Sequence, residues 1–93
     1  MKLPTSFKLN GMPITVRVHD GMEYDKSGEW DFQNLEIRLY PKGRSYEYMT
    51  QTFYHELMHA IEDVVVGRSS HKERDIDLRG NGVLQFFKTR KYG

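Results

Sequence analysis

The feature that most constrains the fold is a helical pattern of apolar residues between Tyr46 and Val66. Apolar side chains recur there at steps of three and four residues, which is the spacing of an amphipathic helix with one buried face. The residues on this face are Met49, Phe53, Leu57, Ala60, Ile61 and Val64. Such a face needs a second layer to cover it, so we expect the rest of the chain to supply one.

Strand patterns precede the helix and predict that layer. Residues 7–9 and 14–19 flank Asn10-Gly11, a dipeptide typical of tight hairpin turns. Residues 20–29 carry glycine, aspartate and serine and are predicted to form an exposed loop. Residues 29–32 and 35–39 flank a turn at Gln33-Asn34 and predict a second hairpin. We therefore expect a small antiparallel sheet of hairpins.

The C-terminal third predicts a second helix. Ser45 is a candidate cap for the first helix, and Gly67 is expected to end it. Ser70 and Glu73 then match the S-x-x-E capping box, followed by apolar residues at helical spacing to about residue 90. Gly80 and Gly82 either allow close approach to the first helix, which we favour, or break the second helix at residues 79–82. The predicted fold is α+β, with the sheet packed on the first helix and a second, C-terminal helix completing a single domain over residues 1–93.

Composition narrows the classes of protein and of metal site that are compatible with this chain. The 93 residues include no cysteine, which excludes disulfides and thiolate metal sites. The net charge is +1, but residues 1–66 carry −3 and residues 67–93 carry +4. The basic residues 88–91 could contact nucleic acid, although we favour a role at the C-terminus of a helix. Because no long apolar run occurs, we expect neither export nor membrane insertion, and a cytoplasmic location.

The first helix also carries the motif His55-Glu56-Leu57-Met58-His59, which matches H-E-x-x-H. Residues four apart lie on one helix face, so both imidazoles can converge on one metal ion. Glu56 then lies beside the metal, where it can act as a general base towards a metal-activated water. The alternative is a chance match in which two histidines line the polar side of a helix. We favour the metal site because the motif lies on a helix, as it requires.

A catalytic zinc usually has three protein ligands and an open position for water. A third histidine six residues after His59 would fall at position 65, where Val65 excludes that subclass. Glu62 is poorly placed, since it lies two turns beyond His55. The best candidate is Glu73, which has Asp77 four residues later on the same face. A capping box alone would also explain Glu73, and His71 is the next contender.

H-E-x-x-H followed by E-x-x-x-D on a second helix resembles the gluzincins, the thermolysin-like clan of zinc metallopeptidases. The short spacing is similar to that of small phage- and prophage-encoded metallopeptidases, and the resemblance covers about residues 13–90. It implies that His55, His59 and Glu73 bind zinc, that Glu56 is the general base and that Asp77 accepts a hydrogen bond from a ligating imidazole. It also implies that residues 35–39 form an edge strand able to hold an extended peptide, where an ordinary edge strand is equally compatible. The oxyanion-stabilising residue stays unassigned among Tyr54, His71 and Tyr92.

We therefore expect a zinc-dependent peptidase that hydrolyses peptide bonds in a peptide or protein substrate. The alternative is a non-catalytic metal-binding module, regulatory or for interaction, of phage or mobile-element origin. A nucleic-acid-associated protein that uses the basic C-terminal residues is a third and less favoured reading. Steep salt dependence of DNA binding would distinguish that reading.

Overall fold

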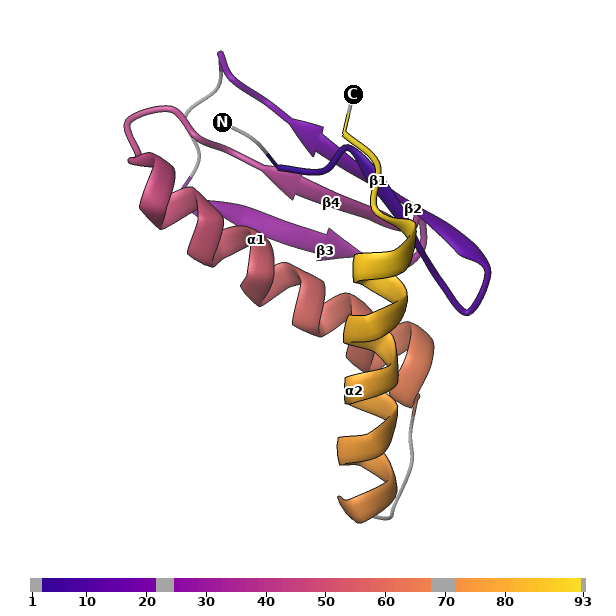
Figure 1. Ribbon diagram of the computed structural model, residues 1–93. Coiled ribbons are helices and arrows are strands. Elements are labelled where there is room, and N and C mark those ends of the chain that lie inside the picture. The colour runs from indigo at the N-terminus through magenta and orange to yellow at the C-terminus, as the bar shows by residue number, and fades with distance from the viewer. Residues whose placement is uncertain (1–2, 22–24, 68–71, 93) are drawn as a thin grey trace.

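The computed structural model describes residues 3–21, 25–67 and 72–92, with the backbone alone for residues 72–76. It confirms an α+β fold in which four strands precede two helices (Figure 1). The elements are β1 (Ser6–Leu9), β2 (Met12–Val18), β3 (Gly28–Asp31), β4 (Glu36–Leu39), α1 (Tyr46–Ile61), the π-helical turn η1 (Glu62–Val66) and α2 (Lys72–Thr89).

The sheet is mixed, and the prediction of a purely antiparallel sheet is wrong at its centre. The strand order is β1-β2-β4-β3. The two hairpins are antiparallel, but β2 pairs with β4 in parallel, with Thr15 opposite Glu36 and Val18 opposite Leu39. After β2 the chain passes to the outer strand β3. It then turns back, so that β4 lies between β2 and β3 and runs parallel to β2. The strand at residues 35–39 is therefore central, and its predicted role as a peptide-binding edge is wrong.

Both hairpin turns form where the sequence predicts them. Asn10 and Gly11 have φ angles of 50° and 76°. Such positive φ values at both central positions match the twist of the paired strands β1 and β2. In the second turn Leu35 takes the positive φ, at 51°. Asp31 holds this turn together, since its carboxylate accepts hydrogen bonds from the backbone and side-chain N–H groups of Asn34.

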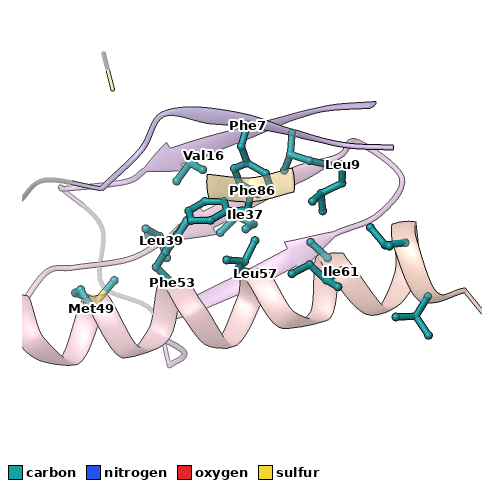
Figure 2. Packing of buried hydrophobic residues seen from close by; sticks show 14 residues of the cluster. Phe7, Leu9, Val16, Ile37, Leu39, Met49, Phe53, Leu57, Ile61 and Phe86 are labelled. Carbon is teal, nitrogen blue, oxygen red and sulfur yellow. The ribbon is translucent and has the colours of Figure 1, made fainter. Parts of the chain in front are cut away.

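The core lies between the sheet and α1, as the helical periodicity predicts (Figure 2). Alternate residues of β4 point into it, with Ile37 and Leu39 fully buried. They meet the apolar face of α1, on which Phe53 and Ile61 are also fully buried. This packing turns the opposite side of α1 towards solvent and places His55 and His59 there, while Leu57 of the same motif lies in the core.

Both predicted ends of α1 are confirmed. Ser45 caps the helix, because its Oγ accepts a hydrogen bond from the backbone N–H of Tyr48 at 3.1 Å. The helical conformation continues through the wider turn η1 and stops at Gly67, where φ is +65°. The predicted capping box at the start of the second helix involves Ser70 and the side chain of Glu73, which lie outside the described residues.

Helix α2 is continuous through both glycines, and the predicted close approach is confirmed at Gly82. A Cβ atom there would lie 2.6 Å from Cγ2 of Ile61. Beyond this contact, α2 buries Phe86 against Phe7 and Phe53, with ring centroids 5.0 and 5.8 Å away. The N-terminal half of α2 extends away from the sheet in Figure 1. Among the described side chains of α2, Phe86 is the one that the core buries fully, and Leu78 and Val83 pack against its border.

Neither helix, over the residues described, combines the length and apolar character that crossing a bilayer requires.

Candidate metal site and adjoining pocket

The two histidines of the motif point their rings at each other on the exposed side of α1. Their Nε2 atoms are 3.1 Å apart, and the ring planes meet at 84°. The spacing of four residues brings them together across one helical turn. Neither ring packs into the core, because the apolar face of α1 lies on the other side of the helix.

The separation of the two Nε2 atoms fits a shared metal ion. Zinc binds imidazole nitrogen at about 2.0–2.1 Å, so two ligands at tetrahedral angles lie about 3.3 Å apart. The same distance also suits a hydrogen bond from a protonated to an unprotonated ring nitrogen. The two arrangements differ in what they do to the neighbouring carboxylate, Glu56.

Glu56 is a buried carboxylate, with 8% of the residue exposed. It forms no ion pair with any residue that the structure describes. Buried carboxylates are rare unless a cation or several hydrogen bonds compensate them. A divalent cation on the adjacent imidazoles would attract this carboxylate, whereas a hydrogen bond between neutral imidazoles would add no charge beside it. The spacing of the two imidazoles is thus compatible with a shared metal ion, and Glu56 lies beside them.

A pocket of about 340 Å³ opens beside Glu56. Its volume lies at the small end of the range for ligand sites, roughly 300–1,000 Å³. Five of its lining residues come from α1, and the sixth comes from the segment before β3. The lining residues are Ser27, Tyr48, Gln51, Thr52, His55 and Glu56. One possible metal ligand and the predicted general base thus face the same hollow.

Sequence reasoning missed four of these lining residues. Gln51 and Tyr48 precede His55 by four and seven residues, so helical periodicity alone could have placed them on its face. Thr52 precedes Glu56 by four residues, so the same periodicity places these two on one face. Ser27 carries no local signal, because the folding of the sheet against α1 brings it to the pocket.

The other carboxylates close to the motif in sequence have partners elsewhere. Glu62 forms an ion pair with Arg79 of α2. Asp63 accepts a hydrogen bond from Nε1 of Trp30 at 2.7 Å, which ties the end of the motif helix to β3. Neither carboxylate completes a three-ligand set with the two imidazoles.

The predicted site residues of the second helix do not join the motif within the described residues. Asp77 is exposed, and no hydrogen bond between described residues links it to either imidazole. It precedes the Gly82 contact by five residues, or about 7.5 Å of helical rise. The side chain of Glu73, and all of His71, lie outside the described residues. Their roles therefore stay predictions from sequence.

A separate charge cluster occupies the face of the sheet opposite α1. Arg38 lies there among Glu29, Asp31 and Glu36. Hydrogen bonds, first from Lys26 and then from Tyr40, lower the pKa of Glu29 from 4.5 to about 2. The three carboxylates in turn raise the pKa of Arg38, and the largest contribution is its hydrogen bond to Asp31. Ile37 and Leu39 separate this cluster from α1. The cluster therefore stabilises the sheet and is not part of the candidate site.

Comparison of the chain with protein-family models, curated proteins and solved structures finds no match. The described residues also contain no group of three or more His, Cys, Asp or Glu side chains that could hold a metal ion. The predicted resemblance to the gluzincins and to small phage-encoded metallopeptidases is therefore wrong. Its physical basis was a second helix delivering a carboxylate to the imidazoles. Helix α2 crosses the end of α1 at Gly82 and directs its C-terminal half into the core, and none of its described side chains forms a hydrogen bond with either imidazole.

Proposed function

We propose that the chain is a zinc-dependent peptidase in which His55 and His59 hold the metal and Glu56 is the general base. The observation that carries the proposal is the 3.1 Å separation of the two Nε2 atoms beside a largely buried carboxylate that forms no ion pair with a described residue. This arrangement supports metal binding without a third protein ligand being assigned.

When bound, zinc lowers the pKa of a coordinated water to about 7 and polarises a carbonyl oxygen. His55 and His59 would hold the metal at the edge of the pocket. Glu56 would accept a proton from the attacking water. The same carboxyl group would then donate that proton to the departing amine.

The pocket supports peptide as the substrate class. It adjoins both His55 and Glu56, so a side chain held in the pocket brings its own backbone close to the general base. The lining groups, mainly hydroxyls and an amide, can hydrogen bond to peptide groups. Positioning of this kind accounts for a large part of enzymatic rate enhancement.

A non-catalytic metal-binding module is the second candidate. It is favoured by the finding that the described residues offer two histidine ligands and no third. Incubation of the zinc-loaded protein with a mixed peptide library, followed by mass spectrometry, separates the two functions. We expect cleavage that a chelator abolishes and added zinc restores. Stoichiometric zinc binding with no cleavage would favour the module, and cleavage that survives chelation would contradict a metal-dependent peptidase.

A further inference from the structure

Two of the residues that line the pocket present a pair of neighbouring hydroxyl groups. Ser27 Oγ and Thr52 Oγ1 lie 2.8 Å apart and share one hydrogen bond. One hydroxyl donates to the other, so the accepting hydroxyl keeps its own hydrogen free for a further partner. Both oxygens also retain lone pairs. The pair can therefore donate one hydrogen bond and accept others at the same point.

This combination matches a carboxamide group. The carbonyl oxygen of an asparagine or glutamine side chain can accept the free hydroxyl hydrogen, and its NH₂ group can donate to a hydroxyl oxygen. Gln51 and the phenol of Tyr48 line the same pocket and add further donors and acceptors. All four of these lining groups are neutral.

The charge of the lining disfavours an acidic side chain. The six residues that line the pocket include no lysine or arginine, and Glu56 contributes a carboxylate. At the hydroxyl pair, away from the metal proposed at His55 and His59, an aspartate or glutamate side chain would lose water without gaining a cationic side-chain partner. An aliphatic side chain would leave the hydroxyls without the water they otherwise bind, which is also unfavourable.

The backbone holds the hydroxyl pair in place. A Cβ atom at Gly28 would lie 2.7 Å from Cγ2 of Thr52 and 3.0 Å from the carbonyl oxygen of Arg38. Only glycine allows the start of β3 to approach α1 this closely. Ser27, one residue earlier, is thereby fixed against Thr52. Preorganised polar groups of this kind discriminate between ligands because little ordering is needed on binding.

We propose that the Ser27 and Thr52 hydroxyls select a substrate with an asparagine or glutamine side chain, which the pocket holds next to the scissile peptide bond. This specificity rests on the proposed peptidase function. The two can nevertheless fail separately, since side-chain recognition can be measured as binding, without any cleavage.

The test uses acetylated, amidated pentapeptides of alanine with glutamine, glutamate, methionine or lysine at the central position. Their affinities for the zinc-loaded full chain are measured by NMR titration, and cleavage is followed in parallel by mass spectrometry. We expect the glutamine peptide to bind about tenfold more tightly than the others, with the largest shifts at Ser27 and Thr52. Binding without cleavage would leave the recognition intact while counting against the peptidase.

Two variants remove the hydroxyls one at a time. Thr52→Val keeps the shape of the side chain, and Ser27→Ala removes the other partner. Each should reduce the affinity for the glutamine peptide to that of the methionine peptide. Thr50→Val is the matched control, because the Thr50 hydroxyl donates to the carbonyl oxygen of Tyr46 and does not line the pocket. It should bind as the wild type does.

Three results would overturn the inference. Equal affinities for all four peptides, including no binding by any, would show that the pocket does not recognise the amide. Tightest binding of the lysine peptide would show that the charge of Glu56 selects the substrate. Unchanged glutamine preference in both Thr52→Val and Ser27→Ala would show that the hydroxyls have no part in it.

Discussion

Gly82 of α2 packs against Ile61 of α1 with no space for a side chain, since a Cβ atom there would lie 2.6 Å from Cγ2 of Ile61. This contact sets the crossing point of the two helices and explains a glycine inside an 18-residue helix. Gly80, two residues earlier, faces open space, with nothing within 4 Å of its ideal Cβ position.

The two glycines should therefore respond oppositely to alanine. Gly82→Ala should reduce the free energy of unfolding by about 1–3 kcal/mol, because the helices must separate or distort. Gly80→Ala should increase it by up to about 1 kcal/mol through better helix propensity. Urea denaturation followed by circular dichroism measures both. Equal stabilisation by the two substitutions would contradict the close contact.

The charge cluster around Arg38 predicts acid sensitivity. Hydrogen bonds, first from Asn34 and then from Arg38, lower the pKa of Asp31 from 3.8 to about 2, and the pKa of Glu29 is also about 2. Because both folded-state pKa values are depressed, their stabilising contribution is complete above about pH 4.5 and is lost as the pH falls towards 2. The free energy of unfolding should decrease across this window.

Arg38→Met tests the source of this acid sensitivity. Without the guanidinium, the pKa values of Glu29 and Asp31 should rise towards their ordinary values, and the decrease in stability should become smaller. Lys88→Met is a suitable control, because Lys88 forms no ion pair with a described residue. Urea denaturation at a series of pH values measures the slope. An identical slope in wild type and Arg38→Met would show that Arg38 contributes nothing to it and that the hydrogen bonds from Lys26, Tyr40 and Asn34 account for the lowered pKa values.

Replacement of the proposed general base should separate metal binding from catalysis. Glu56→Gln removes the proton acceptor but neither imidazole, so zinc content should stay near that of the wild type while peptide hydrolysis falls about 10²–10⁴-fold. Glu47→Gln changes an exposed carboxylate in the first turn of the same helix and should leave both unchanged. Elemental analysis and peptide cleavage assays measure the two properties. Near-normal cleavage by Glu56→Gln would refute the mechanism.

Local sequence signals predicted most of the fold. Asn10-Gly11 marked the first hairpin, Ser45 and Gly67 marked the ends of the motif helix, and Gly82 marked the helix contact. Each of these residues acts through its own backbone or an adjacent turn. The parallel pairing of β2 with β4 was not predictable in this way, because hairpin patterns fix pairing within each hairpin and not between hairpins.

The candidate site likewise has parts that the sequence predicts and parts that depend on tertiary contacts. The meeting of His55 and His59 follows from helical geometry alone, so sequence predicted it directly. Ser27 reaches Thr52 only because the glycine after it lets β3 approach α1, a tertiary contact that no local pattern records. The positions of Glu73 and Asp77 relative to the two imidazoles were not predictable for a related reason, since the spacing of two motifs does not determine how their helices cross.

The central claim is that His55 and His59 jointly hold one divalent metal ion, and calorimetric titration with zinc tests it most directly. The wild type should bind one zinc per chain, and either His55→Ala or His59→Ala should abolish that binding. His19→Phe, which retains a ring to stack on Tyr40, should bind zinc as the wild type does. A folded wild type that binds no zinc, or undiminished zinc binding in both alanine variants, would contradict the account.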